Sequence, residues 1–133
     1  MKASKLILAI TIITILPGCE NLLSKSRETV WLDKNHKYSI SNTSIDNVDS
    51  CNRLSIMTRE RNYDRLSCIT KVGDNDHFII VGTKDDKFWI LNKDKDSSNL
   101  NPNQILEGPF DSIPFMDRKK QLSIADLDFQ KYF

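Results

Sequence analysis

The stretch HFIIVGTKDDKFWILN, residues 77–92, carries the clearest structural signal in this chain of 133 residues. Two apolar runs, 78–81 and 88–91, flank a short polar segment. A two-residue turn at Asp85-Asp86 would pair them as a β-hairpin with Gly82 opposite Trp89, whose ring would cover the bare glycine backbone. Apolar side chains then alternate onto both faces, which predicts a central hairpin covered on both sides. The residues expected at the centre of the core are Phe78, Ile80, Val81, Trp89, Ile90 and Leu91.

Short β-rich runs, separated by polar turn clusters, extend outward from this hairpin. They span residues 29–33, 37–41, 53–58 and 66–72. After Gly108-Pro109, Ser112 is placed to cap a short helix. The predicted fold class is α+β, mainly β, with a single antiparallel sheet of about five or six strands and a short C-terminal helix. The closing aromatics are expected to cap the core in preference to forming an exposed patch: Phe129, Tyr132 and Phe133.

The N-terminus has the layout of an export signal. Lys2 and Lys5 precede an apolar run, residues 6–16, that is short for a membrane-spanning helix. The run ends at Leu16-Pro17-Gly18-Cys19, which resembles the lipobox of bacterial lipoproteins. That resemblance implies cleavage before Cys19 and acylation of this residue, so that several acyl chains anchor the mature protein in a membrane. Residues 1–18 are then the signal peptide, 19–28 a lipidated tether and 29–133 a single globular domain.

This assignment also predicts location and charge. Glu20 is not the aspartate that commonly retains lipoproteins in the inner membrane, so the resemblance favours the periplasmic face of the outer membrane in a diderm host. Without residues 1–18, which hold two of the 19 basic residues and none of the 18 acidic ones, the formal charge is −1. That balance shows no basic excess that would indicate nucleic-acid binding.

Cys51 and Cys68 form an even pair in a chain expected to reach an oxidising compartment, which favours a disulfide between them. The bond would stabilise the fold by roughly 3 kcal/mol in the chain-entropy model. In a direct hairpin with the cysteines opposite each other, Leu54 and Ile56 would face away from Leu66. We therefore expect the disulfide to tie a loop to a strand.

A family resemblance extends beyond the lipobox. The segments KVGDNDHFIIV (71–81), KFWILNKD (87–94) and EGPF (107–110), followed by a charged helix, resemble a family of small bacterial lipoproteins of unknown function. In that family the pattern is a strand, a turn, a second strand with an aromatic-Trp-Ile core, a Gly-Pro break and a helix. The resemblance implies the fold and the location, and it implies no catalytic residue.

Motifs for catalysis or cofactor binding are not found in the sequence. The three glycines after the signal, Gly73, Gly82 and Gly108, are too scattered to form a phosphate-binding loop. Neither histidine lies in a recognisable catalytic motif. A zinc site from both cysteines with His36 and His77 lacks the close ligand spacing usual for zinc. A calcium loop beginning DKDSSN, with Asp94, Asp96 and Ser98 as ligands, has Asn99 where the glycine belongs and Ile105 where the bidentate acid belongs.

Two hypotheses for function remain. The first is a non-catalytic envelope lipoprotein without a cofactor that binds an envelope protein or an incoming protein, as an inhibitor, immunity or exclusion factor. Its expected contact surfaces are the polar loop 93–103 and segment 42–52, because loops on a rigid sheet commonly carry recognition. The alternative is a small envelope enzyme or ligand carrier whose site is assembled from distant residues, for which a concave pocket with convergent polar groups would be evidence.

Overall fold

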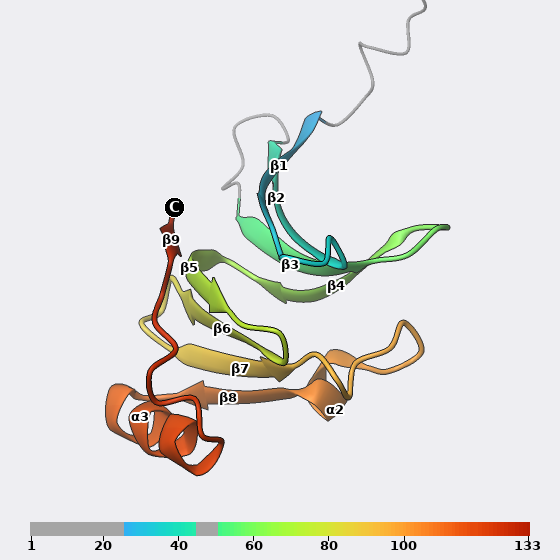
Figure 1. Cartoon of the computed structure of the whole chain (residues 1–133). Coiled ribbons are helices and arrows are strands. Elements are labelled where there is room, and N and C mark those ends of the chain that lie inside the picture. Colours follow the sequence, from blue (N-terminus) through green and yellow to red (C-terminus); the bar gives the residue numbers. More distant parts are fainter. Residues whose placement is uncertain (1–25, 45–50) are drawn as a thin grey trace, which may run out of the picture.

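The computed structural model describes residues 26–44 and 51–133, which form two antiparallel sheets (Figure 1). The first sheet contains, in order, β1 (Ser26–Leu32), β2 (Tyr38–Ser44), β3 (Asn52–Met57) and β4 (Asn62–Ser67). The second has the order β8-β7-β6-β5-β9, with β5 (Ile69–Asp74), β6 (Phe78–Thr83), β7 (Phe88–Asn92), β8 (Leu106–Phe110) and β9 (Lys131–Tyr132). Helix α2 (Pro102–Ile105) precedes β8, and α3 (Ser112–Gln121) follows it. The predicted class, α+β and mainly β, is confirmed.

The number of sheets differs from the prediction because of one residue. The run 66–72, expected to be one strand, is divided at Cys68, whose φ of +60° is a left-handed conformation that no regular strand adopts. Ser67 ends β4 in the first sheet, and Ile69 begins β5 in the second. The single predicted sheet is therefore two sheets joined by one residue. In addition, β1 starts at Ser26, three residues before the strand predicted at 29–33.

The disulfide between Cys51 and Cys68 is confirmed, but its setting is not the predicted one. Both cysteines lie just outside the open end of a β3–β4 hairpin, in which Arg53 pairs with Ser67 and Leu54 with Leu66. The register shifts between Leu54 and Ser55, where β4 carries one extra residue. This bulge places Leu54 and Leu66 opposite each other, which an unbroken register would not allow. The mismatch that argued against the hairpin is therefore resolved by the bulge.

The central hairpin is present with a register one residue from the predicted one. Ile79 pairs with Leu91, Ile80 with Ile90 and Val81 with Trp89. The connection is a three-residue loop, 84–86, closed by a 3.0 Å hydrogen bond from the Thr83 amide to the Lys87 carbonyl. Asp86 has a φ of +57°, as expected where a type I turn is followed by a left-handed residue. The loop length, not the apolar pattern, sets this register.

The register also changes the partners of the strand glycines. A Cβ on Gly82 would lie within 3 Å of the Lys71 side chain, whose methylenes cover this position. Trp89 instead lies against Gly108, where a Cβ would come within 2.9 Å of its ring. Gly108 has a φ of +140°, which disfavours any other residue there. The predicted covering of Gly82 by Trp89 is wrong.

The second sheet lies between the first sheet and α3 (Figure 1). Two apolar clusters pack on its opposite faces, so the expected double coverage is confirmed. Between the sheets, Tyr38, Ile40 and Leu54 pack with Ile79, Val81 and Leu91, among others. On the opposite face, Ile80 and Ile90 pack with residues of α3 and the following segment, namely Phe115, Ile124 and Leu127. Of the six residues predicted to centre the core, four are buried, and Phe78 and Trp89 are half-buried at its edges.

The C-terminal region differs from the prediction in detail. Asp111, not Ser112, is at the N-cap position of α3, where its side chain makes no capping hydrogen bond, and Ser112 is the first residue of the helix. Its buried face is formed by Phe115 and Lys119. Of the three aromatic residues expected to cap the core, only Phe129 does so, and it packs near the Phe88 and Phe115 rings. Tyr132 and Phe133 are exposed. Neither helix in the described part of the chain is long and apolar enough to cross a membrane.

Candidate functional site

Lys93 is the centre of a buried ionic contact between the two sheets. Its Nζ lies 3.2 Å from Asp33 Oδ2, in the turn between β1 and β2, and 3.0 Å from Asp74 Oδ2 at the end of β5. The Lys93 side chain is 6% exposed and that of Asp33 is 1% exposed. The other Asp33 oxygen, Oδ1, accepts hydrogen bonds from the backbone amides of Lys37 and Tyr38. Each charge therefore has compensating partners, as buried charges require.

A second buried contact joins Arg65 on β4 to Asp96, which follows β7. Arg65 donates two hydrogen bonds to the Asp96 carboxylate, of 2.9 and 3.1 Å, and a third of 2.7 Å to the carbonyl of Ser97. The hydroxyl of Tyr38 donates to Asp96 Oδ2 at 2.8 Å. Burial, together with the hydrogen bond to Asp96, raises the pKa of Tyr38 far above its usual range, so the phenol remains protonated. The contact joins the two sheets, and its polar groups are hydrogen-bonded to one another.

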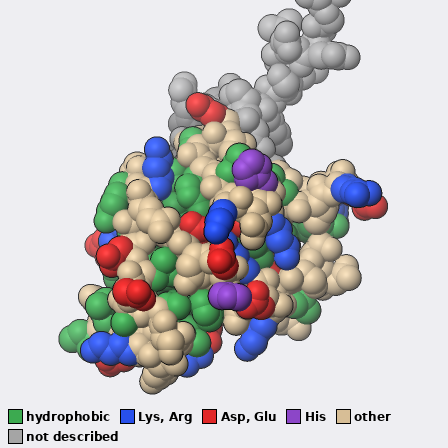
Figure 2. All heavy atoms as spheres, viewed as in Figure 1, with side chains coloured by type: hydrophobic (Ala, Val, Ile, Leu, Met, Phe, Trp, Pro, Cys, Tyr) green, Lys and Arg blue, Asp and Glu red, His purple; other side chains and the backbone are tan. Residues whose placement is uncertain are grey.

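Three turns meet around the Lys93 contact: 33–37, 74–77 and 93–96. At the surface Lys34 pairs with Asp76, and His77 Nδ1 lies 2.8 Å from Asp94 Oδ2. Figure 2 shows both histidines of the chain on one face, with acidic and basic side chains between them. In catalytic triads the carboxylate that orients the histidine is buried. Because Asp94 is 63% exposed, the His77–Asp94 pair is a surface contact and lacks this feature of a triad.

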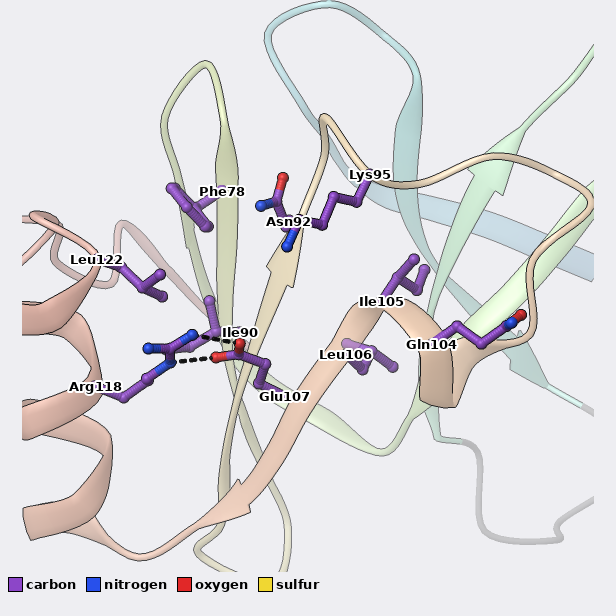
Figure 3. Close-up of a pocket in the computed structure, with 10 residues that line it drawn as sticks. All are labelled: Phe78, Ile90, Asn92, Lys95, Gln104, Ile105, Leu106, Glu107, Arg118 and Leu122. Atoms are coloured by element: carbon purple, nitrogen blue, oxygen red, sulfur yellow. Dashed lines mark hydrogen bonds and ion pairs between the residues drawn. The ribbon is translucent and has the colours of Figure 1, made fainter.

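A small pocket opens between α3 and β8 (Figure 3). We call it the α3–β8 pocket. Its volume is about 90 Å³, below the roughly 300–1,000 Å³ of sites for small organic ligands. Five of its lining side chains are apolar, and we call them its floor: Phe78, Ile90, Ile105, Leu106 and Leu122. The other five are polar, and of these Lys95 and Gln104 are exposed: Asn92, Lys95, Gln104, Glu107 and Arg118.

An ion pair fixes one side of this pocket. Arg118 on α3 donates hydrogen bonds of 2.7 Å from both Nε and Nη2 to the two carboxylate oxygens of Glu107 on β8, as the dashed lines in Figure 3 mark. These hydrogen bonds hold the pKa of the Glu107 carboxyl below its usual range. The pair therefore remains ionised at neutral pH, and its bidentate geometry restrains both side chains.

The residues considered above for zinc and calcium sites, which the sequence did not favour, are not brought together in the structure. Cys51 and Cys68 are oxidised to a disulfide, which leaves no thiolate for zinc. Asp96 pairs with Arg65, while Asp94 pairs with His77, so two of the three residues considered as calcium ligands have different partners. Within residues 26–44 and 51–133, no group of three or more His, Cys, Asp or Glu side chains is placed to hold a metal ion.

The residues predicted for anchoring and recognition have different outcomes. Cys19, the predicted lipidation site, lies outside the described residues, as do residues 45–50 of the second recognition segment. At the described ends of that segment, Asn42 and Asn52 pair across β2 and β3. The polar loop 93–103, expected to be a contact surface, has two buried residues, Lys93 and Asp96, which are not available for contact. Its end also forms the first two residues of α2.

No family model matches this chain, and no curated protein or solved structure is significantly similar to it. The arguments for function therefore rest on the sequence and on the geometry described above.

Proposed function

We propose that this protein is a lipid-anchored component of the bacterial cell envelope and acts by binding another protein, as an inhibitor, immunity or exclusion factor. The resemblance of Leu16-Pro17-Gly18-Cys19 to a lipobox supports the anchor and the outer-membrane location in a diderm host. The buried charged groups described above form ion pairs with one another, which supports a role in protein binding over catalytic turnover. Lys93 and Arg65 are both paired with carboxylates within the fold.

The observation that carries the proposal is the way the loop after β7 is held. Lys93 and Asp96 fix it to both sheets through buried ion pairs, whereas Asp94, Lys95 and Asn99 are exposed. A loop fixed at internal points presents its exposed side chains with little conformational freedom left to lose on binding. Such loops on a rigid sheet commonly carry recognition.

The anchor has a direct test. Metabolic labelling with a fatty-acid analogue is expected to label the wild-type protein and to localise it to membranes, because the Cys19 thiol and the new amine carry the acyl chains. Cys19→Ser is expected to abolish the label and to leave the precursor unprocessed or release the protein from membranes. A wild-type protein that is soluble and unlabelled would refute the anchor.

The binding role is tested by capture from detergent-solubilised envelope with the mature lipidated protein as bait. We expect one protein to be captured reproducibly and to be lost when exposed loop residues are replaced, because these residues make the contact. Lys93 and Asp96 must be kept, since replacing the whole loop would break both buried ion pairs. The informative variant therefore carries three substitutions: Lys95→Ser, Asn99→Ser and Asn103→Ser.

A matched control carries three serine substitutions at exposed positions near the β3–β4 turn. These are Arg59→Ser, Glu60→Ser and Asn62→Ser, and capture is expected to persist. Equal loss with both variants would argue against the loop as the contact. Capture of no protein, combined with turnover of an envelope substrate by the purified protein, would favour the enzyme alternative.

A further inference from the structure

We propose that the α3–β8 pocket receives a single aliphatic side chain, leucine or isoleucine, from the protein partner, and that an acidic residue lies beside this side chain in the partner. The inference rests on the proposed function, because it gives the chemistry of the partner at one point of contact. Three observations carry it: the size of the pocket, its apolar floor with fixed walls, and the charge at its opening.

The size limits the occupant. A cavity of roughly 150 Å³ holds benzene, with six carbons, so the 90 Å³ here has room for about four carbons. Four carbons are the content of a leucine or isoleucine side chain. An aromatic ring is too large for this space, and an alanine methyl would leave most of it empty.

The floor and walls suit an apolar group that enters from solvent. Ile90 and Ile105 are buried at 1% and 3% exposure, and the remaining apolar lining residues are half-buried. The lining comes from β6, β7, α2, β8 and the end of α3, and the Arg118–Glu107 pair links two of these elements. Side chains held in this way lose little freedom when a ligand binds. Interfaces commonly concentrate affinity in such a pocket, filled by one buried anchor and surrounded by polar groups.

The opening carries an excess of positive charge. Arg118 and Glu107 neutralise each other through two hydrogen bonds, while Lys95 is exposed and makes no ion pair with any residue of the described chain. Lys95 is near enough to help lower the pKa of Glu107. The charged lining residues therefore sum to one net positive charge, and an acidic residue beside the anchor complements it.

The pocket is continuous with the loop proposed for recognition. Lys95 belongs to that loop, and Figure 3 shows Lys95 and Asn92 side by side at the top of the view, with Gln104 of α2 on the opposite side from Leu122. A partner that contacts the exposed loop is thus positioned to insert a side chain beside it. The inserted aliphatic side chain would therefore lie at the edge of the surface that the partner makes with loop 93–103.

The test uses the ¹⁵N-labelled mature lipidated protein in detergent micelles, titrated with acetylated and amidated tripeptides and followed by amide chemical shifts. The probes are Asp-Leu-Asp, Asn-Leu-Asn, Lys-Leu-Lys and Asp-Ala-Asp. Asp-Leu-Asp is expected to bind best and to shift the amides of Ile90, Leu106 and Leu122. The neutral peptide should bind about two- to fivefold more weakly, the range for one exposed charge pair. Asp-Ala-Asp should bind at least about tenfold more weakly, because it lacks three buried carbons.

Two variants test the two parts of the proposal. Lys95→Glu changes an exposed side chain and is expected to reverse the preference, so that Lys-Leu-Lys binds more tightly than Asp-Leu-Asp. Leu122→Trp fills the space and is expected to abolish the shifts of Ile90 and Leu106 on titration. Leu122→Trp could also disturb folding, so its amide spectrum without peptide must be native-like for the result to count. If that spectrum is lost, Lys95→Glu alone decides whether the pocket binds the peptides.

The proposal is overturned if Asp-Leu-Asp shifts no pocket amide, or if Lys95→Glu leaves the order of the peptides unchanged. These outcomes are separate from failure of the proposed function, since the peptides are synthetic and require no knowledge of the partner. A captured envelope protein that binds the Lys95→Glu and Leu122→Trp variants as well as wild type would refute the pocket contact while leaving the binding role intact. Equal binding of Asp-Leu-Asp and Asp-Ala-Asp would likewise contradict the proposal that the pocket receives an aliphatic side chain.

Discussion

Arg65→Met is expected to lower the free energy of unfolding by about 3–5 kcal/mol, because it leaves the buried Asp96 carboxylate without its cation. The side chains of Arg65 and Asp96 are 2% and 0% exposed. In the variant the Tyr38 hydroxyl still donates to Asp96, but one neutral donor does not replace a bidentate guanidinium. Urea denaturation followed by tryptophan fluorescence measures the loss. For a small domain the loss is a large share of the total stability of roughly 5–15 kcal/mol.

Arg53→Met is the matched control on the same sheet. Arg53 pairs with Asp64 at 3.4 Å, and both side chains are about half exposed, so we expect a loss of at most about 1 kcal/mol. Adding Asp96→Asn to Arg65→Met should recover part of the stability, since it removes the uncompensated charge. Equal losses for Arg65→Met and Arg53→Met would show that the Arg65–Asp96 contact is not buried as described.

Leu91→Ala is expected to cost about 3–5 kcal/mol, because it removes a fully buried side chain from the cluster between the sheets. Leu91 lies opposite Ile79 on the neighbouring strand, and both side chains are at most 1% exposed. Chemical denaturation again measures the effect. A loss below about 1 kcal/mol would be typical of a surface position and would contradict this placement.

Double-mutant cycles with the same variant test the register of the hairpin. In the observed register Leu91 faces Ile79, whereas a two-residue turn would place it opposite Ile80. The losses from Leu91→Ala and Ile79→Val should therefore be non-additive by about 0.5 kcal/mol or more. Those from Leu91→Ala and Ile80→Val should add within about 0.5 kcal/mol, since Ile80 packs in the other cluster. The reverse pattern would favour the two-residue turn.

Much of the fold is predictable from the sequence because its signals are local. Alternating apolar residues at 78–81 and 88–91 identify the central strands, and Pro109 with Ser112 and Pro114 indicates the helix. The division into two sheets is not predictable in this way. It depends on the left-handed conformation of Cys68, which leaves no mark in an apolar pattern, whereas the bulge in β4 appears in the sequence only as the mismatch of Leu54 with Leu66. The register depends on a loop of three residues where a two-residue turn also fits the sequence.

The buried charges are less predictable than the strands. Arg65, Lys93 and Asp96 lie in or beside segments that read as polar strand edges or loops, and their partners are distant in sequence. One signal exists for Arg65, which lies directly before the β-rich run 66–72. Nothing local distinguishes Asp96 from Asp94, although one is buried and the other is exposed. The α3–β8 pocket is also assembled from residues 78–122, so no single motif describes it.

The order of the strands has a consequence for the speed of folding. Among the strand pairs described, all except β5–β9 join strands that are neighbours in sequence, so each closes a short loop at little entropic cost. The contacts between the sheets are different, because Tyr38 and Asp96 are 58 residues apart and Asp33 and Lys93 are 60. The charged members of these contacts must also lose water before they meet. We therefore expect association of the two sheets, rather than formation of either one, to limit the folding rate.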